Sequence, residues 1–258
     1  MKVVILAGGL GTRISEESKF KPKPMIEIGG LPIIWHIMKS YSFYGYNDFI
    51  ICAGYKQHII KEWFYNYFIH QSDIKFSYKT GHREMEVLNS NIEPWDVSVI
   101  DTGYSTMTGG RVKRIEEYVK GETFMLTYGD GVCDVNINEL IKFHKSHGKT
   151  ATITSVIQKQ AKGVLDLDKA GAVRSFREKK NNDGAPINAG FMVLEPKIFE
   201  YLKGDETILE QEPMEKLADD GELMSYTHNG FWQCMDSLRE HEVLEEMWSK
   251  GKAPWKIW

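Results

Sequence analysis

The chain alternates short, continuous apolar runs with longer stretches in which apolar residues recur at helical spacing. Continuous runs indicate buried strands, and the longer stretches indicate amphipathic helices. The pattern predicts strands at 3–6, 48–55, 123–128, 151–158 and 187–194. It predicts helices at 31–45, 56–68, 139–147, 196–202 and 237–250.

Strand and helix follow one another along most of the chain, which is typical of right-handed β–α–β units. Segment 164–176 alternates on both sides of a Lys-Ala-Gly turn and predicts a hairpin, whereas 70–110 holds short strand-like pieces and long turns. No repeat or linker-like shift in composition divides the chain. The sequence therefore predicts the α/β class, with a Rossmann-like mixed, mainly parallel central sheet flanked by helices, in a single domain over 1–258.

Charge and cysteine content narrow the functional classes. The formal net charge of -4 lacks the basic footprint of general nucleic-acid binding, so we expect no nucleic-acid partner. The 3 cysteines are widely spaced and form no C-x-x-C pair, which fits a reducing compartment. No apolar run approaches the ~18 residues of a membrane helix. We expect a cytoplasmic protein without a membrane partner.

The first strand leads directly into a glycine-rich loop that carries cations. Gly8, Gly9 and Gly11 follow the strand, Arg13 comes next, and Lys23 stands between two prolines. Glycines let backbone N–H groups approach an anion, and consecutive turn amides form a phosphate-binding nest. The dinucleotide fingerprint G-x-G-x-x-G fails, because an isoleucine occupies the position of the third glycine. A tight surface turn with solvated cations is the plain alternative, but the added cations favour a site for a small anion.

The string L-A-G-G-L-G-T-R, followed by K-P-K, resembles the signature of the sugar-1-phosphate nucleotidyltransferases, and the resemblance extends over nearly the whole chain. It implies the nucleotide-diphospho-sugar transferase fold, with a nucleotide-binding part at about 1–135 and a sugar-binding part at about 136–258. It implies that Arg13 and Lys23 are catalytic, because they would neutralise the reacting phosphates. Nucleotide binding is assigned to Leu6, Ala7, Gly8, Gly9, Gly11, Thr12, Arg13, Gly110 and Arg111.

Two aspartates are candidates for holding Mg²⁺. Asp130 follows an apolar strand in a Gly-Asp step, which is also a strong turn signal. Asp236 precedes S-L-R-E, a capping box in which Ser237 can cap the helix while Asp236 points into a site. Mg²⁺ takes one or two carboxylates and completes its coordination with phosphate oxygens and water. The resemblance places the metal on Asp130 and Asp236, and Asp134 is a weaker candidate.

The resemblance also implies a site for a sugar phosphate. It assigns this site to Gly163, Glu178, Lys179 and Asn188, although a Glu-Lys pair alone is a common surface feature. The strings D-T-G…T-G-G-R, I-N-A-G-F and G-F-W-Q-C-M-D-S-L-R resemble family members that use CTP and glucose 1-phosphate. The expected reaction transfers a cytidylyl group to glucose 1-phosphate, with Mg²⁺ as cofactor.

Several alternatives stay open at this point. UTP or dTTP could replace CTP in the same chemistry. A non-catalytic sugar-nucleotide sensor would be expected to lose the charged residues that this chain retains, and an NAD-linked oxidoreductase lacks its third glycine. The resemblance also predicts a homo-oligomer and allows a hexamer. The aromatic segments FYNYFIH and APWKIW are candidates for subunit contacts, with ordinary core packing as an equal alternative.

Overall fold

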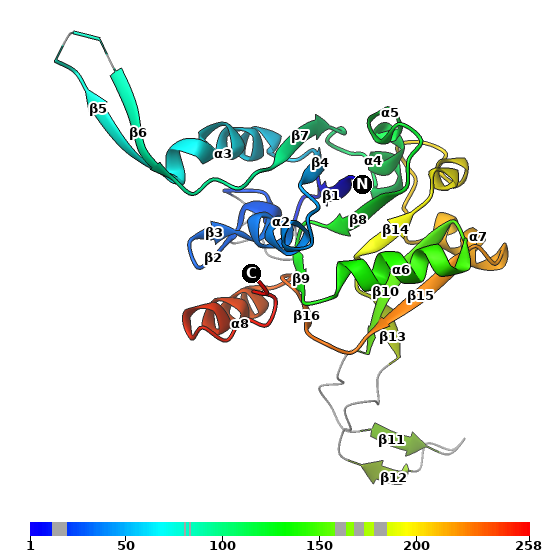
Figure 1. The fold of residues 1–258 in the computed structure, drawn as a ribbon. Coiled ribbons are helices and arrows are strands. Elements are labelled where there is room, and N and C mark those ends of the chain that lie inside the picture. Colours follow the sequence, from blue (N-terminus) through cyan, green and yellow to red (C-terminus); the bar gives the residue numbers. More distant parts are fainter. Residues whose placement is uncertain (12–19, 80, 83, 158–163, 168–172, 178–184) are drawn as a thin grey trace.

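The computed structural model of the chain describes residues 1–11, 20–79, 81–82, 84–157, 164–167, 173–177 and 185–258. Its centre is a twisted sheet with helices on both faces (Figure 1). The strand order is β13-β10-β14-β8-β1-β4-β7, and β15 pairs with β10. The bounds are β1 Val3–Ala7, β4 Asp48–Ala53, β7 Asp96–Asp101, β8 Phe124–Tyr128, β10 Ala151–Ile157, β13 Pro186–Asn188, β14 Met192–Leu194 and β15 Leu223–His228.

Strand direction follows the sequence pattern. β1 pairs in parallel with β4 and β8, and β4 with β7. β14 is antiparallel to both β8 and β10, so β10 runs with the parallel group, as does its parallel neighbour β15. The predicted mixed, mainly parallel sheet is therefore confirmed.

Side chains alternate across the sheet and build two cores. In β1, Val3, Ile5 and Ala7 face one core while Val4 and Leu6 face the other, because successive strand residues point to opposite faces. The first core is covered by α2 (Ile33–Phe43), α3 (Gln57–His70), α6 (Ile137–His147) and α8 (Leu238–Ser249). The second is covered by α4 (Thr108–Arg114), α5 (Glu116–Val119), the 3₁₀ helix η3 (Pro196–Tyr201) and α7 (Glu212–Asp219).

Most predicted elements are present, but several differ or were not expected. The run 187–194 is split into β13 and β14, because Gly190 and Phe191 adopt left-handed backbone angles (φ +75° and +49°). The segment 196–202 forms a 3₁₀ helix rather than an α-helix. α7 and β15 were not predicted, since β15 is only half-buried and its apolar pattern is weak.

Smaller elements complete the fold. A ribbon of β5 (Ser72–Ser77) and β6 (Glu84–Ser90) projects from the body, as Figure 1 shows. The predicted hairpin is present as β11 (Val164–Leu167) and β12 (Val173–Arg177). The remaining short elements are η2 (Lys23–Met25), β2 (Glu27–Ile28), β3 (Leu31–Pro32), β9 (Gly131–Cys133) and β16 (Trp232–Cys234). Among the described helices, none has the length and hydropathy needed to cross a bilayer.

The parallel strands end level with one another, and this positions the loops that matter. Leu6 is in register with both Cys52 and Tyr128, and Ala53 with Asp101. The loops after β1, β4, β7 and β8 therefore emerge side by side at one edge of the sheet. Carboxyl ends of strands in open α/β sheets are the usual place for ligands.

Candidate active site

The loop after β1 is shaped by glycine. Gly8 is buried, Gly9 is exposed, and Gly11 has φ +64°, a conformation that favours glycine. Thr12 and Arg13, which the sequence assigns to nucleotide binding, lie outside the described residues. Gly8, Gly9 and Gly11 all line the cavity described below, where they present backbone without a side chain.

Arg111, on α4, connects the loop after β1 with the loop after β7. Its guanidinium donates to the carbonyl oxygens of Gly8 (3.0 Å) and Gly103 (2.7 Å) and to the Thr102 hydroxyl (2.8 Å). Longer bonds reach the carbonyl oxygens of Ala53, at the end of β4, and of Tyr104, and only 4% of Arg111 is exposed. Burial lowers the pKa of Arg111 because the charged form is desolvated. The sequence predicts Arg111 as a nucleotide-binding donor, but in this structure its N–H groups bind the backbone of the loops.

Gly110 has a packing role in this structure. Its N–H donates to the Thr207 carbonyl (3.1 Å), and a Cβ at Gly110 would lie 2.6 Å from the backbone of Asp205. Glycine here lets α4 pack closely against the segment that follows η3. The sequence suggests the Gly110 N–H and the Arg111 guanidinium as donors for recognition of the base. Both already donate hydrogen bonds to oxygen atoms of the protein.

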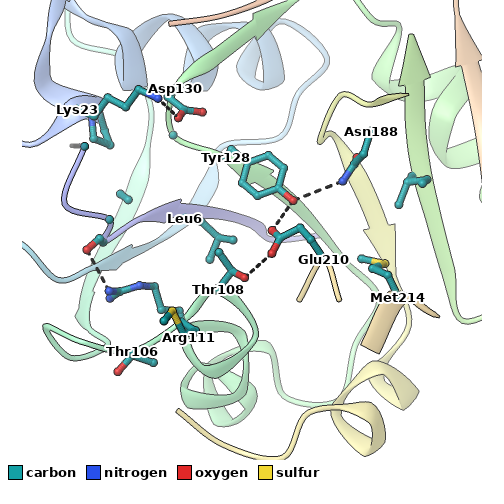
Figure 2. Close-up of a pocket in the computed structure, with 18 residues that line it drawn as sticks. Leu6, Lys23, Thr106, Thr108, Arg111, Tyr128, Asp130, Asn188, Glu210 and Met214 are labelled. Atoms are coloured by element: carbon teal, nitrogen blue, oxygen red, sulfur yellow. Dashed lines mark hydrogen bonds and ion pairs between the residues drawn. The ribbon is translucent and has the colours of Figure 1, made fainter. Parts of the chain in front are cut away.

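A cavity of about 730 Å³ opens above these loops (Figure 2). Lys23 and Asp130 lie on one side of it, and Asn188, Glu210 and Met214 lie on the other. The lining residues include five of the predicted nucleotide-binding positions besides Arg111, namely Leu6, Ala7, Gly8, Gly9 and Gly11. A site of this size fits a small organic ligand that carries phosphates.

Lys23, Asp130 and Asp236 meet at one side of the cavity. The Lys23 Nζ lies 2.6 Å from Asp130 Oδ2 and 2.5 Å from Asp236 Oδ1, and Lys23 is 9% exposed. Burial acts to lower the pKa of Lys23, but the two carboxylates outweigh it and the net pKa is raised. Pairing of β9 with β16 brings the aspartates together, and the Met235 N–H donates to the Asp130 carbonyl (2.8 Å).

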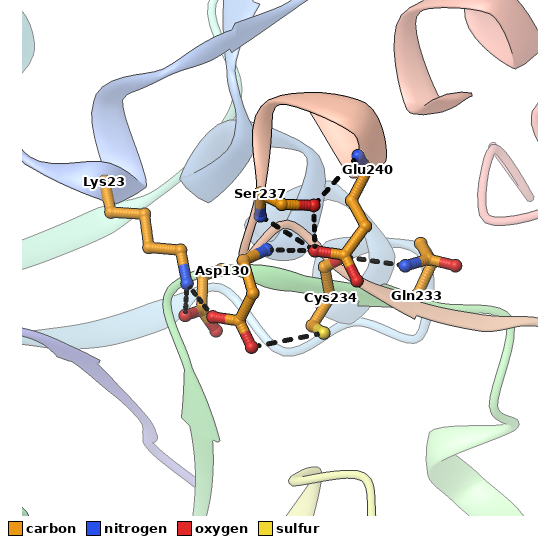
Figure 3. Close-up of polar contacts among 7 residues, drawn as sticks. Lys23, Asp130, Gln233, Cys234, Ser237 and Glu240 are labelled. Atoms are coloured by element: carbon orange, nitrogen blue, oxygen red, sulfur yellow. Dashed lines mark hydrogen bonds and ion pairs between the residues drawn. The ribbon is translucent and has the colours of Figure 1, made fainter. Parts of the chain in front are cut away.

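The Asp236 side chain, which precedes α8, reaches Lys23. Figure 3 shows Ser237 and Glu240 at the start of this helix. Ser237 caps the helix, since its hydroxyl accepts from the Glu240 N–H and the Glu240 carboxylate accepts from the Ser237 N–H. The same carboxylate accepts the Asp236 N–H at 2.7 Å. The predicted capping box is confirmed, and the Asp236 carboxylate is not used as the cap.

The sequence matches the family described as nucleotidyl transferase over residues 2–237. The chain belongs to the nucleotidyl transferase family. The glucose-1-phosphate cytidylyltransferase of Salmonella typhimurium is 57% identical over 259 aligned residues, which cover 100% of both chains.

Solved structures agree with the fold. HddC from Yersinia pseudotuberculosis is 25% identical with a TM-score of 0.69, covering 96% of this chain and 99% of that one. A UDP-glucose pyrophosphorylase complexed with UDP-glucose has a TM-score of 0.69 at 17% identity, covering 97% and 98% of the two chains. The second likeness concerns the fold alone.

A smaller cavity of about 240 Å³ adjoins the main one in this nucleotidyl transferase, and both are lined by Tyr128, Asp130 and Asn188. Asn188 is oriented by the Gly190 N–H, which donates to its Oδ1 (2.9 Å). The other residues that the sequence assigns to the sugar phosphate lie outside the described residues: Gly163, Glu178 and Lys179.

Asp134, the weaker metal candidate of this nucleotidyl transferase, has a structural role here. It accepts from His228 Nε2 (2.8 Å) and from the Phe231 N–H (2.7 Å), and it is not among the described residues that line either cavity. Beside it, burial raises the pKa of the Cys133 thiol, which disfavours the thiolate that a metal would need.

Sequence reasoning missed three lining residues that interact with one another. Tyr128 and Thr108 both bind the carboxylate of Glu210, which lies between η3 and α7. A Gly-Asp step marks the end of β8, so Tyr128 could have been noticed as its neighbour. Nothing local marks Glu210, because the contacts that define it come from segments 82 and 102 residues away.

Proposed function

We propose that this nucleotidyl transferase transfers a cytidylyl group from CTP to α-D-glucose 1-phosphate, giving CDP-glucose and pyrophosphate. The observation that carries the proposal is the 57% identity with the Salmonella glucose-1-phosphate cytidylyltransferase over the full length of both chains. The two adjoining cavities support it, because a nucleotide and a hexose phosphate need neighbouring sites. In this proposal residues of about 1–135 chiefly bind the nucleotide, and residues of about 136–258 chiefly bind the sugar.

An oxygen of the sugar phosphate attacks the α-phosphorus of CTP, and the bond from that phosphorus to the pyrophosphate oxygen breaks. The second pKa of a phosphate ester is ~6, so the attacking group is already largely a dianion and needs no general base. The obstacle is repulsion between two polyanions, which positioning and charge neutralisation overcome. The backbone of the glycine loop and Arg13 would bind the triphosphate, Lys23 would bind the reacting phosphates, and Lys179 the sugar phosphate.

The donor set beside Lys23 in the cavity fits a magnesium ion. Asp130 and Asp236 supply two carboxylates against the single charge of Lys23, which leaves a net negative charge for a divalent cation. We propose that these two aspartates hold Mg²⁺. When bound, the ion would neutralise charge on phosphate oxygens. Glu178 and Asn188 would bind sugar hydroxyls, with Gly163 allowing close approach.

Pyrophosphate release tests the reaction directly. The purified protein is incubated with Mg²⁺, glucose 1-phosphate and one of CTP, UTP, dTTP, ATP or GTP. Release with CTP, together with CDP-glucose identified by mass spectrometry, is the expected result. Release with UTP or dTTP but not with CTP would refute the choice of nucleotide, and no release with any nucleotide would refute the enzyme.

We also propose that the protein assembles with copies of itself. Register places Ile74 beside Val87 and Phe76 beside Met85, so apolar side chains share one face of the projecting ribbon. Phe76 is 42% exposed, and Tyr78, which follows on the same face, is 68% exposed. A two-stranded ribbon is marginally stable in water by itself, so a second copy is a suitable cover. Light scattering should give a multiple of the chain mass, which Phe76→Asp should reduce; a monomeric wild type would refute the assembly.

A further inference from the structure

Glu210 lies at the wall of the larger cavity, at the end of the segment that packs against α4. Leu209 before it is fully buried and anchors this segment, while Glu210 turns its carboxylate towards Tyr128 and Thr108 (Figure 2). Glu210 lines the cavity that contains the glycine loop, and it is not among the described residues that line the smaller cavity. Glu210 therefore lies in the cavity that we assign to the nucleotide.

Hydrogen-bond directions around Glu210 are set by its neighbours. The Leu209 N–H donates to the Thr108 hydroxyl oxygen (2.9 Å), so the Thr108 proton is directed at Glu210 Oε2, 2.6 Å away. The Asn188 amide donates to the Tyr128 hydroxyl oxygen (3.4 Å), so the Tyr128 proton is directed at Oε1, also 2.6 Å away. Both oxygens of Glu210 thus act as acceptors, and each keeps a further lone pair for a ligand donor.

The two sides of the cavity suit the two ends of a nucleotide. The glycine loop, Lys23 and Asp130 suit phosphates, as described above. The lining also includes the ring of Tyr128 and the apolar side chains of Leu6, Met107, Ile153 and Met214, which offer apolar surface for a flat base. Glu210 lies on the same side of the cavity as Met214, away from Lys23, where it can meet the polar edge of a base (Figure 2).

We propose that Glu210 determines the choice of nucleobase by accepting a hydrogen bond from the exocyclic amino group of cytosine. Uracil and thymine carry a carbonyl oxygen at that position, which would face the carboxylate acceptor to acceptor. Glu210 is exposed in the ligand-free protein, and a base bound in the cavity would cover its carboxylate. A carboxylate that is covered without gaining a donor disfavours the wrong base. This inference rests on the proposed function, because it assigns the base specificity of that same site.

Glu210→Gln is the sharpest variant, because it keeps the shape and one acceptor oxygen but replaces the other oxygen with a donor. The glutamine oxygen can still accept from one of the two hydroxyl groups, and the other hydroxyl oxygen keeps a second lone pair that can accept from the amide group. We expect the ratio of kcat/KM for CTP to that for UTP to fall ~10- to 100-fold, the range for losing one hydrogen bond to a charged group. Glu206→Gln, the same change of charge outside the cavity lining, should leave the ratio at the wild-type value.

CTP and UTP are best compared in one reaction, with both present at limiting concentration and products separated by charge. An unchanged ratio in Glu210→Gln overturns the inference, whether or not the overall rate falls. A selective rise in KM for glucose 1-phosphate at an unchanged ratio would place Glu210 on the sugar and also overturn it. If the wild type does not use CTP, the proposed function itself fails, and that outcome is visible before any variant is made.

Discussion

Replacing Gly8 with alanine should damage the fold at the base of the active site. A Cβ at Gly8 would lie 2.1 Å from Arg111 Nη1 and 2.2 Å from Arg111 Cζ. An arginine head can often move aside, but this one is 4% exposed and its N–H groups bind loop oxygens on several sides. The guanidinium also packs closely against Gly54, since a Cβ added there would lie 2.5 Å from Nη1.

The magnitude follows from what the displaced guanidinium loses. Moving Arg111 breaks its bonds to Gly8, Gly103 and Thr102, which are the three shortest of its contacts. A hydrogen bond to a charged group contributes about 1.5–3 kcal/mol, so losing two or three of them costs about 3–5 kcal/mol or more. Since a typical domain is stable by only about 5–15 kcal/mol, Gly8→Ala should lose a large fraction of its free energy of unfolding.

Urea unfolding followed by tryptophan fluorescence measures this loss, with Gly9→Ala as the matched control. Among the described residues, none has an atom within 4 Å of a Cβ at Gly9, so Gly9→Ala should unfold like the wild type, within about 1 kcal/mol. In an Arg111→Met background the cost of Gly8→Ala should shrink by about 1–2 kcal/mol or more, because the atoms that it meets are gone. A Gly8→Ala protein as stable as Gly9→Ala, or a cost that is unchanged without Arg111, would refute the reasoning.

Charged groups give three further expected outcomes. Lys23→Ala should lower kcat/KM in the pyrophosphate assay by ~10²–10³, the scale for losing one preorganised charge contact; a near-normal rate in the folded variant contradicts its role. Burial lowers the pKa of His36 from 6.5 to about 4, so the unfolded chain binds the proton first as pH falls through that window. As pH falls from 6.5 to 4, the free energy of unfolding should therefore decrease by up to about 3 kcal/mol. In urea titrations at several pH values, His36→Gln should lack most of this decrease. Hydrogen bonds from Thr150 lower the pKa of Glu222 from 4.5 to about 2, so its stabilisation is present above pH 4.5 and is lost as pH falls. The difference in stability between wild type and Glu222→Gln should accordingly narrow between pH 4.5 and pH 2, and a constant difference would contradict the assignment.

The sequence predicts the fold well where its signals are local. Continuous apolar runs give β1, β4 and β8 because these strands are buried on both faces. Asn136 marks the start of α6, and its side chain accepts from the Glu139 N–H as a cap. β15 is not predicted because its residues are only half-buried, so its apolar pattern is weak. Its pairing with β10 is a long-range contact that the local sequence does not show. The C-terminal aromatic segment shows the same limit, since Trp255 is completely buried in the first core and not exposed for subunit contacts.

The site residues that lie in local sequence motifs could likewise be predicted, and those brought to the cavity by tertiary packing could not. The glycine loop and the Gly-Asp step after β8 are contiguous motifs, so their residues can be recognised directly. Asp236 can be deduced because Ser237 supplies the cap that an aspartate would otherwise provide. Glu210 reads as one more acidic residue near a helix, and only the packing of its segment on α4 brings it to the cavity.

The cationic side chains of the cavity have protein partners in the absence of substrate. Of the described residues that line the cavity, the two cationic ones already have partners: Arg111 binds loop carbonyls, and Lys23 binds two carboxylates. A buried lysine without a counter-charge would be costly, so the aspartates stabilise Lys23 in the absence of phosphate. They also raise its pKa, so Lys23 is charged whenever a phosphate arrives. An incoming phosphate must then compete with Asp130 and Asp236 for the same ammonium group. A cation that neutralises the two carboxylates, such as the proposed Mg²⁺, would release Lys23 for the phosphate, so we expect nucleotide binding to depend on the binding of that cation.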